Sequence, residues 1–146
     1  MSNGESITID VAGARPGDIG AVQAIDERVL GRADRREFLR QAVVRGECLV
    51  GRLDGEIAGF VVVDRSFFDQ RFVALLIVDP DYQRHGIGSA LMRSVEAQFS
   101  GEKLFTSTNA SNLKMQALCE RLGYVRSGVI ENLDDGDPEI IYFKQT

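Results

Sequence analysis

Residues 78–92 read Val-Asp-Pro-Asp-Tyr-Gln-Arg-His-Gly-Ile-Gly-Ser-Ala-Leu-Met. They follow the end of an uninterrupted apolar run, Phe72–Val78, which is typical of a strand buried on both faces of a sheet. Pro80 ends that strand, and Gly86 and Gly88 open an amphipathic helix, where glycine permits positive φ and a close approach of a ligand. The free amides and the dipole at a helix start favour an anion such as a pyrophosphate.

Two well-known phosphate loops do not fit this stretch. The Rossmann fingerprint needs a third glycine, and Leu91 stands at that position. It also needs its strand early in a βαβ unit, whereas this strand follows a predicted hairpin through Asp54-Gly55. The Walker loop needs Gly-Lys-Ser or Gly-Lys-Thr, which the sequence lacks. Two readings remain: another kind of phosphate loop, with Arg84 as a charged contact, or a turn that uses glycine for its geometry alone.

Hydrophobic periodicity and turn signals predict strands and helices in mixed order. The predicted strands are residues 7–11, 48–53, 57–63, 70–78, 104–107, 124–130 and 140–143. The predicted helices are residues 18–29, 34–45, 87–98 and 112–122. Hairpins mixed with helical crossovers indicate one mixed sheet with helices packed on it. Since neither a repeat nor a linker divides the chain, residues 1–146 are expected to form a single domain.

The composition is that of an ordinary globular protein, with 44% hydrophobic and 27% charged residues. This balance excludes a collagen-like rod, a coiled coil and a disordered chain. The longest apolar run is far shorter than a membrane span, and the N-terminus shows no secretory signal, so no membrane partner is expected. Cys48 and Cys119 have no partner spacing, which predicts a reduced, cytoplasmic protein without a disulfide framework or a metal site.

The charge is distributed unevenly along the chain. The net charge of −5 arises from 22 acidic and 17 basic residues, and five acidic residues with no basic one lie between Glu131 and Glu139. A nucleic-acid binder would need a basic surface, for which the arginine-rich segment 28–45 is the nearest candidate. Asp34 and Glu37 temper that segment, so it is interpreted as a solvated helix face, with recognition of an acidic substrate as the alternative. No nucleic-acid partner is expected.

The glycine stretch resembles the acyl-CoA-binding motif of the GNAT superfamily, whose members move an acetyl group from acetyl-CoA to an amine. The resemblance rests on residues 83–88, Gln-x-x-Gly-x-Gly, with Val-Asp-Pro-Asp-Tyr before them and an amphipathic helix after them. A second match is Asn-Ala-Ser-Asn at residues 109–112, followed by Cys-Glu-Arg-Leu-Gly-Tyr at residues 119–124. The likeness covers residues 53–124 well and the rest in element order.

The resemblance implies a fold and a cosubstrate. The fold is α/β (α+β mixed), with a GNAT-like mixed, mostly antiparallel central sheet of about seven strands flanked by four helices. The cosubstrate is acetyl-CoA, and no metal takes part. Strand backbone would pair with the pantetheine arm, and loop amides would surround the pyrophosphate. The cofactor-binding residues expected on this basis are Leu76, Ile77, Val78, Gln83, Arg84, His85, Gly86, Ile87, Gly88, Ser89 and Asn112.

The acceptor amine would attack the thioester directly. An amine with a pKa of about 10 must first lose a proton to a base. In many relatives a glutamate on the fifth strand is the base and a tyrosine on the next helix is the acid, and here Ser107 and Cys119 hold those positions. Ser107 is no strong base, so another carboxylate or a water is required. Cys119 is a candidate acid, with packing as the alternative, and Tyr124 is a second candidate acid. His85 is interpreted as an exposed loop residue or a phosphate neighbour.

In this family the loop between the last two strands commonly borders the acceptor site. Contact with the acceptor is therefore expected for Glu131, Asp134, Asp135 and Asp137. Their charge favours a cationic amine on a small molecule or a peptide. The sequence thus indicates a cytoplasmic N-acetyltransferase, with a non-catalytic acyl-CoA-binding or sensing module as the alternative. A homodimer is kept as a hypothesis.

Overall fold

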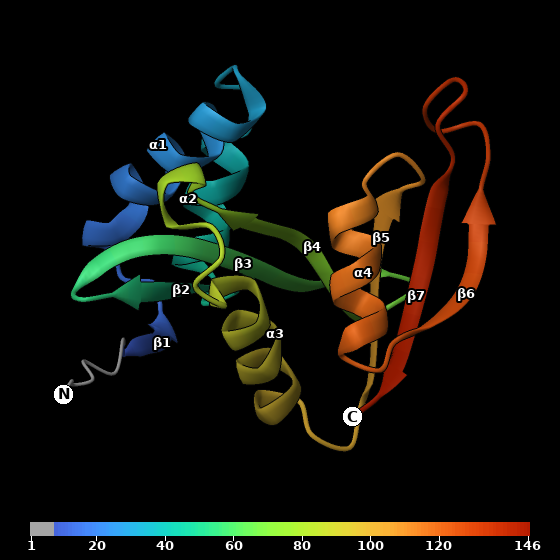
Figure 1. The fold of residues 1–146 in the computed structure, drawn as a ribbon. Helices are drawn as coiled ribbons and strands as arrows, with labels where there is room; N and C mark the ends of the chain where they lie inside the picture. Colours follow the sequence, from blue (N-terminus) through green and yellow to red (C-terminus); the bar gives the residue numbers. More distant parts are fainter. Residues whose placement is uncertain (1–7) are drawn as a thin grey trace, which may run out of the picture. The chain divides into compact units, whose positions relative to one another are not determined.

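The computed structural model describes residues 8–146, and within them seven strands form one sheet in the order β1-β2-β3-β4-β5-β7-β6 (Figure 1). The pairing of β4 with β5 is parallel, whereas β1–β2, β2–β3, β5–β7 and β6–β7 are antiparallel. The expected mixed, mostly antiparallel sheet is therefore confirmed. The strands are β1 Ile9–Gly13, β2 Cys48–Leu53, β3 Glu56–Phe67, β4 Gln70–Val78, β5 Lys103–Asn109, β6 Val125–Ile130 and β7 Glu139–Gln145.

Four α-helices occur in this part of the chain, as predicted. They are α1 Ile19–Leu30, α2 Arg36–Val44, α3 Ile87–Gln98 and α4 Leu113–Arg121. Two short 3-10 helices, at Pro16–Asp18 and Pro80–Tyr82, were not predicted. The bounds of β2, β4 and α3 agree with the sequence prediction, and residue 7 of the first predicted strand lies outside the described residues.

The strand predicted at β3 ended too early, because the turn from β3 to β4 contains no glycine to indicate it. β3 continues beyond residue 63 to Phe67. Phe68 and Asp69 then turn the chain with φ values of 51° and 61°, the left-handed conformation that two-residue hairpin turns require. Asparagine or glycine usually fills such positions, so nothing in the sequence marked the turn.

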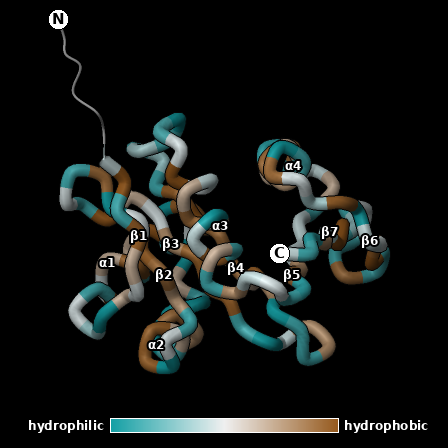
Figure 2. Tube along the Cα trace, turned by 90° about the horizontal axis from the view of Figure 1, so that it is seen from below, coloured by the Kyte–Doolittle hydropathy of each residue, from teal (hydrophilic) through white to brown (hydrophobic). Residues whose placement is uncertain are grey.

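The chain divides into two compact units. The first comprises residues up to 62 together with 75–94, and the second comprises residues 63–74 and 95–146. Hydrophobic residues of α2 (brown in Figure 2) contribute to the first core. The largest fully buried side chains of the first unit are Val22, Leu39, Val50, Phe60, Val61, Val62, Ile87, Leu91 and Met92. Those of the second unit are Val95, Leu104 and Tyr142.

In the first unit the end of β4 passes very close to β3. A Cβ atom on Gly59 would lie 2.8 Å from the carbonyl oxygen of Ile77 and 3.0 Å from Cγ2 of Ile87. Only glycine therefore allows β3, the end of β4 and the start of α3 to pack together here. The amide of Asp79 donates to the carbonyl of Ala58 at 2.8 Å, which fixes the end of β4 at the same place.

Replacing Gly59 by alanine tests this close approach. We expect Gly59→Ala to lower the free energy of unfolding by about 2 kcal/mol, because backbone must move to admit the methyl group. Gly51→Ala is the matched control: Gly51 is the register partner of Gly59, and its Cβ would meet Ile87 and Leu91 at 3.4–3.5 Å, an ordinary contact. Urea denaturation of both variants measures the difference, and equal losses would contradict the account.

Candidate functional site

The chain turns sharply between β4 and α3, where the sequence predicts the phosphate site. Arg84 and Gly86 have φ values of 69° and 80°. The amide of Ala90 donates to the carbonyl of Gly86 at 3.0 Å, a helical bond at the start of α3. The amides of residues 87–89 precede the first acceptors that a helix provides, so they are available to a ligand. The turn therefore presents backbone donors and the positive end of a helix dipole.

The two glycines of the motif do different things. Gly86 lies in the left-handed region, as predicted, whereas Gly88 belongs to α3 and has no positive φ. The expectation of positive φ at Gly88 was therefore wrong, because the helix begins one residue before it, at Ile87. Arg84 adopts the second left-handed conformation instead, which no sequence pattern announced. Gln83, Arg84, His85 and Gly86 are exposed, Ile87 is buried, and Gly88 and Ser89 are half-buried.

Asp79 anchors this turn and was missed in the sequence analysis. Its carboxylate is buried and accepts a hydrogen bond from Nη2 of Arg28 on α1 at 2.5 Å. It also accepts the amide of Asp81 at 3.0 Å, which caps the 3-10 helix after β4. An acidic residue directly before a proline at a strand end was the available signal. Asp79 therefore ties the phosphate turn to α1.

The predicted strand residues Leu76, Ile77 and Val78 lie in the same unit as the turn. All three are half-buried, whereas Val73 on the same strand is only 3% exposed. The parallel register of β4 with β5 runs over Arg71–Val73. The end of β4 thus keeps accessible surface beside the turn, as a strand that pairs with a peptide-like ligand requires.

Most arginines of the arginine-rich segment form ion pairs with carboxylates, Arg45 being the exception within residues 8–146. The ion pairs of the segment are Arg28–Asp79, Arg32–Asp34, Arg35–Asp26, Arg36–Glu27 and Arg40–Glu37. Hydrogen bonds from Arg40 and then Gln41 lower the pKa of the Glu37 carboxyl to about 2. Arg35 holds the buried carboxylate of Asp26 with two bonds, of 2.7 and 3.1 Å. This pairing supports the interpretation as a helix face and leaves little positive charge to recognise an acidic substrate.

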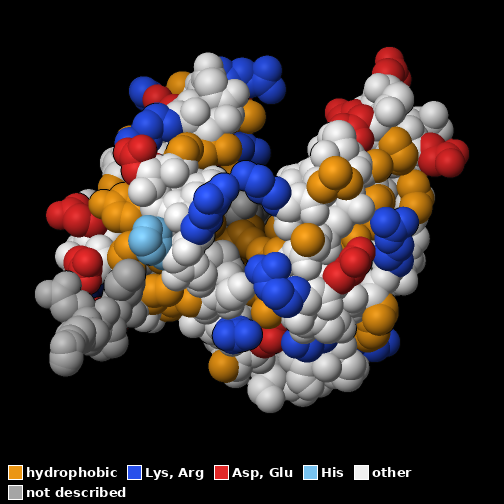
Figure 3. Space-filling view, in the orientation of Figure 1, with side chains coloured by type: hydrophobic (Ala, Val, Ile, Leu, Met, Phe, Trp, Pro, Cys, Tyr) orange, Lys and Arg blue, Asp and Glu red, His pale blue; other side chains and the backbone are white. Residues whose placement is uncertain are grey.

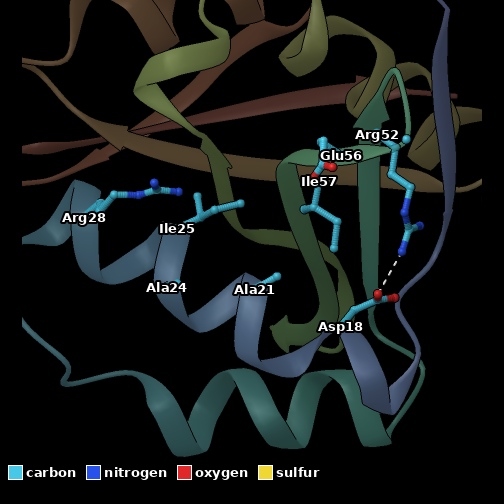
Figure 4. Close-up of a pocket in the computed structure, with 9 residues that line it drawn as sticks. Asp18, Ala21, Ala24, Ile25, Arg28, Arg52, Glu56 and Ile57 are labelled. Carbon is cyan, nitrogen blue, oxygen red and sulfur yellow. Dashed lines mark hydrogen bonds and ion pairs between the residues drawn. The ribbon is translucent and has the colours of Figure 1, made fainter.

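A pocket of about 390 Å³ lies between α1 and the β2–β3 hairpin (Figure 4). Its lining residues are Asp18, Ala21, Ala24, Ile25, Arg28, Arg52, Gly55, Glu56 and Ile57. Arg52 donates to Asp18 at 2.7 Å, and the Arg15 amide is the main cause that holds the pKa of Asp18 below its usual value. The guanidinium of Arg28 is paired with Asp79, outside the lining. Asp18, Arg28 and Arg52 in the lining are therefore paired, and the pocket contains no predicted site residue.

Asn112, expected to contact the cofactor, caps a helix in the second unit. Its side chain accepts the amide of Met115 at 3.1 Å at the start of α4. The acidic loop between β6 and β7 is held by the preceding residues instead. Asn109 donates to Asp134 at 2.9 Å, and the Ser111 hydroxyl donates to Asp137 at 2.6 Å. In Figure 3 the acidic side chains (red) gather at the tip of this loop, at the upper right.

The two candidate acids are buried and engaged. Burial, followed by the charge of Glu120, raises the pKa of the Cys119 thiol to about 12. The Tyr124 hydroxyl donates to Glu96 at 2.7 Å, and burial together with this bond raises the pKa of Tyr124. Lys144 donates to the same carboxylate at 3.0 Å, which completes a closed network. Both groups hold their protons more tightly than a thiol of ordinary pKa, about 8.5, so neither is suited to protonate a thiolate.

The position expected to hold a base has a carboxylate beside it. The Ser107 hydroxyl on β5 donates to Oε2 of Glu139 on β7 at 2.7 Å. Glu139 was counted in the acidic stretch but was not singled out as a site residue. Only the antiparallel register of β5 with β7 brings the two together, and the sequence gives no sign of that register.

Within residues 8–146, no cluster of three or more histidine, cysteine or acidic side chains is arranged to hold a metal ion. None of the helices in the same range combines the length and the apolar character that a membrane crossing demands.

Comparisons with known proteins find a matching family model and several similar solved structures. The model of the Acetyltransferase (GNAT) family matches residues 23–124. A GNAT-family acetyltransferase structure from Bacillus cereus is 37% identical, with a TM-score of 0.88, covering 95% of this chain and 98% of that one. The ribosomal-protein-S18-alanine N-acetyltransferase from Escherichia coli is 23% identical, with a TM-score of 0.80, and coverage of 93% and 92%. NAA60 from Arabidopsis thaliana, in complex with a bisubstrate analogue, is 18% identical, with a TM-score of 0.78, and coverage of 94% and 97%. No curated protein matches the sequence.

Replacing Cys119 separates packing from chemistry. We expect Cys119→Ala to cost about 1 kcal/mol of stability, as a small core truncation does, and to leave acetyl transfer within a few-fold of the wild type. Cys48→Ala is the control, because Cys48 is equally buried and lies in the other unit. A hundredfold fall in kcat at unchanged KM for Cys119→Ala alone would instead show that the thiol acts in the transition state.

Proposed function

The chain belongs to the GNAT acetyltransferase family, and from this premise we propose that it transfers an acetyl group from acetyl-CoA to a primary, cationic amine. The observation that carries the proposal is the turn at residues 83–89. It combines left-handed backbone at Arg84 and Gly86 with the free backbone amides of a helix start. Such a turn suits the pyrophosphate of acetyl-CoA, because its amides can replace the hydrogen bonds that the phosphate oxygens make with water.

The chain's own groups fit this cosubstrate. When bound, acetyl-CoA supplies an activated acetyl thioester. The amides of residues 87–89 donate toward phosphate oxygens, and Arg84, which has no ion pair within residues 8–146, adds a positive charge. The buried Asp79 beside the turn does not repel the phosphates, because Arg28 neutralises it. Backbone groups of Leu76, Ile77 and Val78 offer hydrogen bonds to the amides of the pantetheine arm.

The acidic loop supports a cationic acceptor. Asp134 and Asp137 are held in place by asparagine and serine, which are neutral donors, so the loop keeps its full negative charge. Glu131 and Asp135 are exposed and add to it. In the arginine-rich segment, by contrast, most guanidinium groups form ion pairs with carboxylates, which offset their charge. Uncompensated negative charge raises the local concentration of a cation, so the acceptor is an ammonium-bearing small molecule or peptide.

We also propose that residues 1–146 form one domain in the cytoplasm. β3 and β4 each contribute residues to both compact units, so neither unit can complete its strands alone. Cys48 and Cys119 are free and buried, which is consistent with a reducing compartment.

A non-catalytic acyl-CoA sensor is the alternative, and the burial of both candidate acids favours it. Release of free CoA thiol separates the two functions. We expect the protein to release thiol from acetyl-CoA in the presence of polyamines, aminoglycosides or peptide N-termini, and much less with acidic amino acids. Binding of acetyl-CoA without thiol release for any of these amines would indicate the sensor.

Removing charge from the acidic loop tests the acceptor class. We expect Asp134, Asp135 and Asp137, changed together to Asn, to raise the KM for the cationic acceptor about tenfold, or ~1.4 kcal/mol, with acetyl-CoA affinity unchanged. The KM of the wild type should also rise with salt, because charges farther apart than about 10 Å are screened at 0.1 M. An anionic best acceptor, or an unchanged KM at low salt, would overturn this choice.

A further inference from the structure

Ser107 and Glu139 form a polar pair on one face of the second unit's sheet. The Ser107 hydroxyl donates to Oε2 of Glu139 at 2.7 Å, and both residues are half-buried. In the β5–β7 register Ser107 lies opposite Ile141, and Asn109 lies opposite Glu139. Residues directly opposite each other share a face, so Glu139 is the diagonal neighbour of Ser107 on that face. The pair is therefore a product of strand register.

The carboxylate of Glu139 is free of the cations that engage other acids of this unit. Glu96 accepts from Lys144, and Glu102 accepts from Arg71. Within residues 8–146 no ion pair involves Glu139. A cation-bound carboxylate resists protonation because its charged form is stabilised. Glu139 instead accepts its hydrogen bond from a neutral hydroxyl, that of Ser107.

The register partners of Glu139 on both neighbouring strands are uncharged. Asn109 lies opposite it on β5, and Ile130 lies opposite it on β6. The nearest charged groups along the chain are the carboxylates of Asp137 and Asp135. Asn109 and Ser111 donate to the acidic loop, at Asp134 and Asp137. A cationic amine drawn to the acidic loop therefore meets Glu139 at the strand that the loop enters.

On the basis of the proposed function, we propose that Glu139 is the general base of the reaction and that Ser107 positions it. The acceptor's N–H bond breaks, and the proton binds to the Glu139 carboxylate. The electron pair left on nitrogen forms the new bond to the thioester carbon, the C–S bond breaks, and CoA leaves as the thiolate. The carboxylate that β5 lacks at residue 107 is thus supplied by β7. Ser107 itself need not be a base, because its hydroxyl only orients Glu139.

Isosteric substitution tests this role. Glu139→Gln keeps the size of the side chain and an oxygen for the Ser107 hydroxyl, but it cannot take a proton. We expect kcat with the best amine to fall at least a hundredfold near neutral pH, and the lost rate to return in part as rising pH deprotonates the amine. The KM of the amine and the affinity for acetyl-CoA, measured by calorimetry, should change less than about threefold.

Three further variants complete the test. Asp64→Asn is the matched control, because Asp64 accepts a serine hydroxyl at 2.6 Å in the same unit; its kcat should stay within about twofold. Ser107→Ala should lower kcat about tenfold and keep the wild-type pH profile, as expected of a positioning residue. Glu139→Asp retains a carboxylate, so it should be more active than Glu139→Gln and should keep the wild-type pH profile. This variant keeps the test valid even if Glu139→Gln folds poorly.

The outcomes distinguish this proposal from the proposed function. Normal kcat in Glu139→Gln, with acetyl-CoA bound and amines acetylated by the wild type, would overturn the role of Glu139 and leave the function standing. Equal losses in Glu139→Gln and Asp64→Asn would also overturn it. Failure of the wild type to bind acetyl-CoA, or to release thiol with any amine, would overturn both.

Discussion

The first unit depends on a contact that only glycine permits. A side chain at residue 59 would collide with the Ile77 carbonyl. Because Gly59 has no side chain, β3 and the end of β4 can approach each other closely. The Asp79 amide is bound to Ala58 just beyond this point, and its carboxylate is bound to Arg28. The chain thus leaves the sheet at a fixed place and enters α3 through a fixed turn. The geometry of the turn at residues 83–89 is a consequence of that packing.

The acidic loop and the arginine-rich segment differ in the partners of their charged groups. The arginines between residues 28 and 40 each face a carboxylate, so the segment is close to neutral. The acidic loop is tied down by Asn109 and Ser111, neutral donors that leave its charge intact. The same excess of acid that sets the net charge of the chain therefore has a defined location. We propose that it attracts the acceptor and that Glu139, at the base of that loop, takes the acceptor's proton.

The sequence predicted what local patterns encode. The apolar run of β4 and the glycine motif at the start of α3 gave both elements their correct bounds, and the motif coincides with the turn between them. Roles that depend on distant partners escaped prediction. The role of Asp79 depends on its bond to Arg28, and the role proposed for Glu139 depends on its bond to Ser107. The residues of each pair lie far apart in the sequence, and no local pattern indicates that they meet. Cys119 and Tyr124 were sensible acids by position, but their burial becomes visible only in the folded core.

Calorimetric titration with acetyl-CoA tests the central claim, that the turn before α3 holds the phosphates. Gly46 offers a control, because it shares a left-handed φ of 73° and open space with Gly86 but lies in the α2–β2 turn. Valine at either position strains the backbone equally. We predict one acetyl-CoA bound per chain, with equal affinity in the wild type and Gly46→Val and at least tenfold weaker binding in Gly86→Val. Equal affinities in all three proteins would contradict the account.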